Sequence, residues 1–109
     1  MREICLARLD KTRPVVVLTR DLARAAMTKV TVAPVTSTVK GLSSEVALGV
    51  ENGLDHGCAA SIDNVLTIPA SALGRTVGYL TAHQETALAR AVVLAFDLDV
   101  PLIGGTALS

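Results

Sequence analysis

The sequence predicts a small, mostly β domain with a C-terminal helix, in the α+β class. Short apolar runs separated by turn residues fill residues 3–80, and a helical period follows over residues 82–97. Half of the residues are apolar, yet only Tyr79 and Phe96 are aromatic, so the core must consist of aliphatic side chains. We therefore expect one domain over residues 1–109, a strongly bent antiparallel sheet that forms a small barrel with the helix over one opening.

The first two strands follow from alternation and from a proline. Residues 3–10 alternate apolar and polar side chains, which is typical of a strand with one buried face. A tight polar connection over residues 10–13 leads to Pro14, which cannot donate a hydrogen bond and so suits the first residue of a strand. Val15–Leu18 is continuously apolar, which predicts a central strand buried on both faces.

A helical turn and a third strand come next. Residues 21–29 favour a helical turn or a structured loop, and Asp21 could cap it. The third strand runs from Val30 to Thr36, and Pro34 within it predicts an edge, a bulge or a bend.

The middle of the chain predicts two more strands around a reversal. Residues 45–48 alternate in the manner of a strand, and Asn52-Gly53 supplies residues that tolerate positive φ, so the chain should turn back there. A fifth strand is expected over residues 59–68. Asp63-Asn64 interrupts its apolar pattern with a carboxylate and an amide side by side.

The last elements are a short helical turn, a strand and the helix. The turn is expected over residues 69–73 and the strand over residues 75–80. Thr81 followed by Gln84 has the pattern of a capping box, so a helix should begin at residue 82 and continue to about residue 97. Pro101 should end any helical continuation, and the Gly104-Gly105 tail should be frayed.

Charge is distributed unevenly although the net charge is zero. Residues 1–40 hold eight Lys and Arg against three acids, while residues 41–109 hold two against seven. Because affinity for phosphates depends on a local basic surface, the first third is a candidate polyanion-facing side. The alternative is that these cations are solvated or paired with the later acids. The cations other than Arg13 are Arg2, Arg8, Lys11, Arg20, Arg24, Lys29 and Lys40.

Several classes of protein are disfavoured by what the sequence lacks. No apolar stretch has the length of a membrane span and no signal peptide is evident, so we expect a cytoplasmic protein. Cys5 and Cys58 are too few and too far apart for a zinc pattern, and both are expected to be reduced core residues. There is no phosphate-binding glycine loop and no zinc-helix or Ser/His/Asp signature, so no cofactor and no metal are expected. His56 and His83 could form a proton-transfer pair, but isolated histidines in such places are more often solvated.

The candidate site combines an arginine with hydroxyl groups. Arg13 opens one strand, and Thr36 and Ser37 close the next, so the three side chains could meet at one end of the sheet. The alternatives are a surface ion pair of Arg13 with Asp10 or Asp21, and a strand-end turn capped by the hydroxyls.

The succession of motifs resembles the MazF/PemK/Kid family of endoribonuclease toxins. The matching segments are RPVVVLTRD (13–21), VAPVTST (32–38), EVALGVENGLDHG (45–57), DNVLTI (63–68), LGRTVGYL (73–80) and the final helix. The resemblance spans nearly the whole chain in the family's order. It implies a small SH3-like barrel of the PemK/CcdB type that forms a homodimer and is inhibited by a small antitoxin with an acidic, partly disordered segment.

The resemblance also implies the chemistry. Members of the family cut single-stranded RNA without a metal, by attack of the ribose 2′-hydroxyl on the adjacent phosphate, which leaves a 2′,3′-cyclic phosphate and a 5′-hydroxyl. Arg13 matches the family's strand-start arginine and would stabilise the scissile phosphate, and Thr36 would donate its hydroxyl to the same group. Lys11 and Ser37, their neighbours in the chain, are further candidates for RNA binding.

The chain departs from the family in two places. The connection over residues 10–13 is much shorter than the family's usual flap over the RNA, and Leu66 stands where many members carry a second catalytic arginine. These departures draw attention to Asp63 and Asn64, which could accept a proton or read a base edge through hydrogen bonds. The alternative is a structural pair that satisfies backbone groups near the barrel mouth.

Two other functions fit the same fold. One is a non-enzymatic toxin resembling the CcdB type, although that group uses a tryptophan-bearing C-terminal tail and this chain has no tryptophan. The other is an inactive module that acts only by binding a partner protein.

Overall fold

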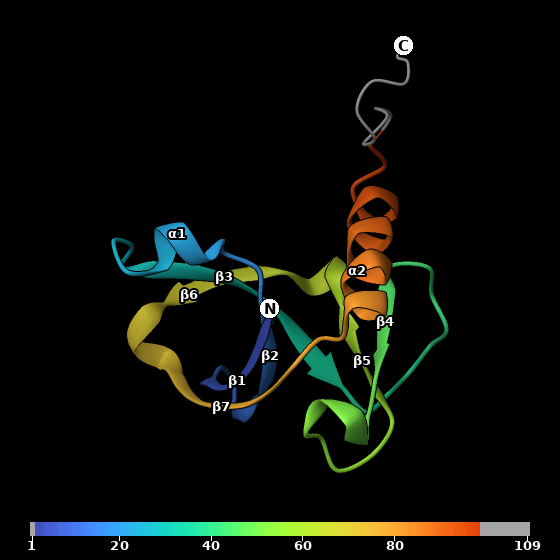
Figure 1. Ribbon diagram of the computed structural model, residues 1–109, viewed down its shortest axis with the longest axis horizontal. Coiled ribbons are helices and arrows are strands. Elements are labelled where there is room, and N and C mark those ends of the chain that lie inside the picture. Colours follow the sequence, from blue (N-terminus) through green and yellow to red (C-terminus); the bar gives the residue numbers. More distant parts are fainter. Residues whose placement is uncertain (1, 99–109) are drawn as a thin grey trace.

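The computed structural model describes residues 2–98, apart from the side chains of residues 21 and 22 (Figure 1). The strands are β1 (Glu3–Arg8), β2 (Thr12–Val17), β3 (Lys29–Thr36), β4 (Glu45–Leu48), β5 (Cys58–Ser61), β6 (Leu66–Pro69) and β7 (Leu73–Tyr79). The α-helices are α1 (Asp21–Arg24) and α2 (Ala82–Ala95), and three 3₁₀ turns are η1 (Val50–Asn52), η2 (Ile62–Asn64) and η3 (Ala70–Ala72). The mostly β fold with a C-terminal helix is confirmed.

All seven strands form one curled antiparallel sheet in the order β4-β5-β3-β2-β1-β7, and β6 also pairs with β3. Figure 1 shows β1, β2, β3, β6 and β7 wrapping into a half-barrel, with α2 standing beside β4 and β5. Because β3 pairs first with β6 and then with β5 on the same side, the sheet bends along this strand.

The two strand prolines lie next to points where a strand loses or changes a partner. Pro14 is the third residue of β2, not its first, and lies just beyond the pairs that β2 forms with β3. Pro34 is inside the sheet, in the gap between the β6 pairs and the β5 pairs of β3. The bend expected at Pro34 is therefore present, because a residue without a donor suits the point where a strand changes partner.

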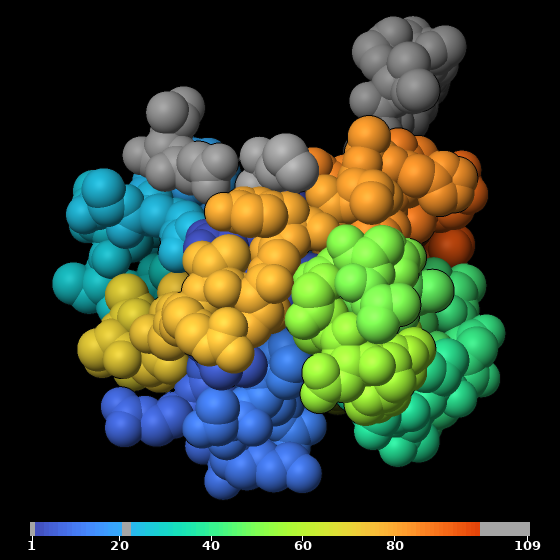
Figure 2. Space-filling model, turned by 60° about the horizontal axis from the view of Figure 1, so that its bottom comes forward, coloured from blue at the N-terminus to red at the C-terminus, as the bar shows by residue number. Residues whose placement is uncertain are grey.

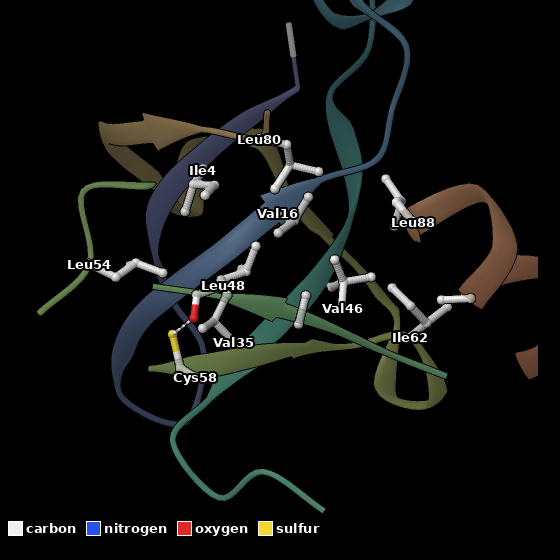
Figure 3. Close-up of a cluster of buried hydrophobic side chains, with 13 residues drawn as sticks. Ile4, Val16, Val35, Val46, Leu48, Leu54, Cys58, Ile62, Leu80 and Leu88 are labelled. Carbon is white, nitrogen blue, oxygen red and sulfur yellow. Dashed lines mark hydrogen bonds between the residues drawn. The ribbon is translucent and has the colours of Figure 1, made fainter. Parts of the chain in front are cut away.

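The continuous burial of Val15 and Val16 on β2 reflects a core on each face of the sheet. Val16 belongs to the larger cluster, which α2 covers, and Val15 belongs to a smaller cluster inside the curl. Figure 3 shows the larger cluster extending from Leu54 and Cys58 at one end to Ile62 and Leu88 at the other. This core of short aliphatic side chains fixes the positions of the strand ends.

The long strand expected over residues 59–68 is wrong. The chain forms β5, then the turn η2, then β6, and Asp63 and Asn64 lie in the turn. Ile62 is buried, whereas Asp63 and Asn64 are exposed. In a straight strand Asn64 would lie on the same face as Ile62, so its polar amide would point toward the core. Asp63 and Asn64 thus lie in the turn between β5 and β6, not within a strand.

The capping box of α2 is confirmed. Gln84 N donates to Thr81 Oγ1 at 3.1 Å, and Thr81 N donates to Gln84 Oε1 at 2.9 Å. Gln84 is 8% exposed and also exchanges hydrogen bonds with Asn52, which ties the helix to η1. Such a buried polar pair is stable only because both amides are satisfied.

Several predicted boundaries differ from the structure. Arg20, not Asp21, is the N-cap of α1, and it makes no side-chain capping bond. The strand β7 begins at Leu73, and α2 ends at Ala95 with Asp97 at φ 54°. Pro101 and the Gly104-Gly105 tail lie outside the described residues. Among the helices that the structure describes, none has the length and apolar character needed to cross a membrane.

Candidate active site and its two grooves

Arg13 and Thr36 lie on neighbouring strands and line the same two grooves. The register of β2 and β3 pairs Val15 with Pro34 and Val16 with Ala33. Continuing this register by two residues sets Arg13 opposite Thr36, and residues in such cross-strand positions share one face of a sheet. We call Arg13, Thr36 and Thr38 the ridge, because all three line both of the grooves described below.

The side chain of Arg13 is partly buried and keeps unused donors. Its side chain is 26% exposed, and Nη2 donates to Asp10 Oδ2 at 3.0 Å. The carboxylate of Asp10 is 73% exposed, so the ion pair faces solvent on one side. The Nε atom of Arg13 is buried without a hydrogen-bond partner. An arginine with five N–H donors and one recorded acceptor is suited to bind a further anion.

The hydroxyl of Thr36 is oriented by the turn that follows it. Thr38 N donates to Thr36 Oγ1 at 3.0 Å, so an oxygen lone pair is occupied by the backbone. The hydroxyl hydrogen remains available to a substrate oxygen. The strand-end turn proposed as an alternative is thus present, and it leaves the donor of Thr36 free to act.

The first groove, here the Arg75 groove, has a volume of about 510 Å³. Figure 2 shows the face where the β1–β2 connection (blue), residues 50–57 (green) and β7 (yellow-orange) meet around it. Its charged and titratable lining consists mainly of potential cations, with one carboxylate: Lys11, Arg13, Asp55, His56 and Arg75. The hydroxyls of Thr36, Ser37 and Thr38 form one of its edges.

The second groove, here the Asp63 groove, has a volume of about 750 Å³ and lies on the other side of the ridge. Its charged lining has three acids against two cations: Asp10, Glu45, Asp63, Arg13 and Lys40. Apolar side chains, including Leu9, Pro34 and Leu66, contribute the rest together with Asn64. The two grooves therefore differ in charge and share the ridge.

Residues 37–44 form a wall of the Asp63 groove and are held by two side chains. Glu45 Oε1 accepts from the backbone N–H groups of Gly41 at 2.9 Å and of Lys40 and Leu42 at 3.2 Å each. Ser44 Oγ donates to Asp63 Oδ2 at 2.5 Å. The carboxylate of Glu45 thus neutralises a cluster of backbone donors that would otherwise attract an anion.

The two thiols are poor candidates for chemistry. Cys58 is 7% exposed at the base of the Arg75 groove, and burial together with the charge of Glu51 raises the pKa of its thiol. Burial likewise raises the pKa of Cys5. Both are free, as expected of core residues, and a raised pKa lowers the thiolate fraction that a nucleophile needs. In the described part of the chain, no three His, Cys, Asp or Glu residues gather to form a metal site.

The residues proposed from the sequence fall on both sides of the ridge. Lys11 and Ser37 line the Arg75 groove, whereas Asp63 and Asn64 line the Asp63 groove. His56 lines the Arg75 groove, but His83 lies on the first turn of α2, outside both. Arg75 was not predicted to lie at the site, and Lys40 was named only as one cation of the first third, because nothing in their local sequence separates them from solvated surface cations.

Comparisons with known proteins agree with this architecture. A family described as PemK-like, MazF-like toxin of type II toxin-antitoxin system matches residues 3–96. The endoribonuclease MazF3 of Mycobacterium tuberculosis is 54% identical over 99 residues, which cover 91% of this chain and 96% of the relative. The probable endoribonuclease MazF5 of the same species is 38% identical over 88 residues, covering 78% and 79%.

Solved structures give the same result. The Mycobacterium tuberculosis toxin MazF-mt6 superposes with a TM-score of 0.88 at 54% identity, over 90% of this chain and 99% of that chain. A mycobacterial endoribonuclease in complex with its cognate antitoxin shares the fold, with a TM-score of 0.80 at 21% identity over 91% and 95% of the two chains. The chain belongs to the PemK-like, MazF-like toxins of type II toxin-antitoxin systems.

Proposed function

We propose that this chain is an endoribonuclease toxin that cuts single-stranded RNA and thereby inhibits translation and growth. The cut needs no metal, because a guanidinium supplies the positive charge at the phosphate. The ribose 2′-oxygen attacks the adjacent phosphorus, the bond to the 5′-oxygen breaks, and a 2′,3′-cyclic phosphate and a 5′-hydroxyl result. The proton of the 2′-hydroxyl is lost and the leaving 5′-oxygen gains one.

The observation that carries this proposal is the shared ridge. Arg13 and Thr36 border two grooves of opposite character, so an RNA strand that crosses from one groove to the other brings a phosphate against both side chains. Arg13 uses one Nη2 donor for Asp10, so other N–H donors of its two Nη atoms remain, and Thr36 retains its hydroxyl hydrogen. Donors placed in advance where negative charge develops lower the barrier without reorganisation.

Arg13 acts by electrostatic stabilisation. A guanidinium has a pKa above about 12 and is a poor acid, but it binds two phosphate oxygens through parallel N–H donors. Asp10 holds it at 3.0 Å and so fixes its orientation. Thr36 donates to the same phosphate from the neighbouring strand.

The remaining site residues hold the strand on either side. Lys11 and Ser37 bind the RNA backbone in the Arg75 groove, where cations prevail. Asp63 and Asn64 face the bases in the Asp63 groove, where acceptors prevail. With only two aromatic residues in the chain, recognition rests on hydrogen bonds and backbone contacts more than on stacking.

The assembly and location are part of the same proposal, and family membership supports them. The active form is a homodimer in the cytoplasm, where RNA is accessible. The inhibitor is a small antitoxin whose acidic, partly disordered segment folds over the basic side and covers Arg13, since disordered chains wrap broad surfaces.

The test is cleavage of a single-stranded RNA by the purified chain, without antitoxin, in EDTA. Cutting should yield 5′-hydroxyl ends, and Arg13→Ala or Thr36→Val should lower the rate by roughly 100-fold or more, since each removes a transition-state donor. The matched controls are Arg90→Gln and Thr86→Val on α2, outside both grooves, which should cut at the unchanged rate.

Two outcomes would contradict the proposal. Full activity in both ridge variants, with the fold retained by circular dichroism, would remove the site assignment. An absolute need for a divalent metal would remove the mechanism. A toxin of the non-enzymatic type or a binding module would cut no RNA in any form.

A further inference from the structure

The Asp63 groove has the shape and lining of a subsite for a base. It leads directly away from Arg13 and Thr36, so a nucleotide next to the scissile phosphate would enter it. Leu9, Pro34 and Leu66 give it apolar surface, and Leu66 is 36% exposed. Flat bases pack on such surface, while their edges need hydrogen-bond partners.

Asp63 presents one oxygen in a fixed direction. Ser44, which is 7% exposed, donates its hydroxyl to Asp63 Oδ2 at 2.5 Å. Ser44 is itself fixed, because its carbonyl oxygen accepts from Ile62 N at 3.1 Å. Within the described residues, no donor is recorded on Asp63 Oδ1. One carboxylate oxygen is thus anchored and the other is free.

Asn64 adds a second acceptor beside it. Its amide nitrogen donates to Ser61 Oγ at 2.8 Å, and Ser61 is 8% exposed. The amide oxygen therefore remains unengaged in the part of the chain that the structure describes. Asp63 is the more dependable acceptor of the two, because a carboxylate accepts at both oxygens whichever way it is turned.

A hydrogen-bond acceptor on the protein distinguishes cytosine from uracil by the group at position 4 of the base. Cytosine carries an N4 amino group, which donates to a carboxylate, whereas uracil carries an O4 acceptor at the same place. A fixed carboxylate oxygen attracts the amino group and repels O4, so discrimination comes from both the favoured and the disfavoured pairing.

We propose that the Asp63 groove binds one base of the RNA and that Asp63 selects a base with an exocyclic amino group over uracil. This inference rests on the proposed function of the same site and names the class of nucleotide that it prefers. Ser44 is a positioning residue in this scheme, since it acts through Asp63.

The test measures binding without cutting. Fluorescence anisotropy would compare 12-residue 2′-deoxy oligonucleotides of cytosine and of uracil, which lack the attacking hydroxyl. The unaltered chain should bind the cytosine oligomer about tenfold more tightly, in line with about 1–3 kcal/mol for a specific base contact. Asp63→Asn, which keeps the size and the Ser44 bond but replaces the free oxygen with a donor, should abolish the difference.

The matched control is Asp55→Asn, which removes a carboxylate from the Arg75 groove. It should keep the preference for cytosine. If Asp63→Asn loses its fold by circular dichroism, Ser44→Ala replaces it and should lower the preference for cytosine, because Asp63 then loses the bond that orients it. Equal binding of both oligomers by the unaltered chain, or an unchanged preference in the folded Asp63 variant, would overturn the inference.

The same proteins then separate the two proposals. A chain that prefers cytosine but cuts no RNA would refute the proposed function and leave the base subsite standing. A chain that cuts RNA with no preference for amino-bearing bases near the cut would refute only the subsite.

Discussion

The two grooves that meet at the ridge are built in different ways. The Arg75 groove is bounded by residues 53–56, and this segment starts at Gly53, where the backbone lies directly against β7. The Asp63 groove is bounded by residues 37–44, which rest on Glu45 through hydrogen bonds to a carboxylate. One wall is therefore set by close packing and the other by charge, and the two should respond to different perturbations.

The backbone contact depends on two glycines. A Cβ at Gly78 would lie 1.9 Å from Asn52 O, and a Cβ at Gly53 would lie 2.0 Å from Val77 O. Gly53 also has φ +82°, in the left-handed region that favours glycine. No side chain fits between η1 and β7, so the glycines fix the distance of the wall from the strand.

The largest effect is expected for Gly78→Ala, which tests the wall set by close packing. Because the added methyl meets backbone atoms and not a flexible side chain, η1 must shift, and we expect the free energy of unfolding to fall by about 3 kcal/mol. Urea denaturation would measure this loss. Binding of oligonucleotides should also weaken, while the preference for cytosine, set by the other groove, should persist in the folded fraction.

The control for this variant is Gly57→Ala, directly after residues 53–56. A Cβ there has no neighbour within 4 Å, and its φ is not in the left-handed region. Its unfolding free energy should change by less than about 0.5 kcal/mol. Equal stability of the two alanine variants would show that the wall does not rest on the Gly78 contact.

A smaller effect is expected for Arg75→Gln, which removes one cation from the Arg75 groove. Arg75 is exposed and lines the first groove, so it should bind one phosphate. Removing one phosphate contact makes the slope of log affinity against log salt less steep by about 0.7 for a single strand. The gain in affinity on lowering the salt from 1 M to 0.1 M is then about fivefold smaller. Anisotropy titrations at several salt concentrations would measure this slope.

The matched variant is Arg90→Gln on the exposed side of α2. It removes the same charge at a residue that lines neither groove, and it should leave the slope unchanged. An equal loss in both variants would mean that Arg75 acts only through the net charge of the protein, not through a contact in the groove.

The sequence predicted those parts of the fold that depend on neighbours in the chain. The capping box at Thr81 and the reversal at Gly53 are local signals, and both are confirmed. The strand over residues 59–68 was wrong because its apolar pattern hides a change of partner, from β4 and β3 to β3 alone. Only the bend of the sheet explains why η2 interrupts it.

The candidate site shows the same limit. The predicted strand ends and the family resemblance both drew attention to Arg13 and Thr36, and the antiparallel pairing of β2 with β3 supplies the reason for their proximity. Arg75 and Glu45 could not be found in this way. The contribution of Arg75 depends on a strand distant in sequence, and that of Glu45 depends on the path of the backbone over residues 40–42.

The smallest effect is expected for Glu45→Gln, which tests the wall held by charge. The neutral amide oxygen accepts the backbone donors less strongly, and the amide nitrogen cannot accept them, so unfolding should become easier by about 1 kcal/mol. Hydrogen exchange at the amides of Lys40, Gly41 and Leu42 should accelerate, whereas Glu85→Gln on α2 should leave them unchanged. Because Ser44 precedes Glu45 and anchors Asp63, the preference for cytosine should fall in part, while the salt slope set by the Arg75 groove should not move. Unchanged exchange at these three amides would show that the wall is held by something other than the carboxylate. Charge would then not distinguish the wall of the Asp63 groove from the packed wall of the Arg75 groove.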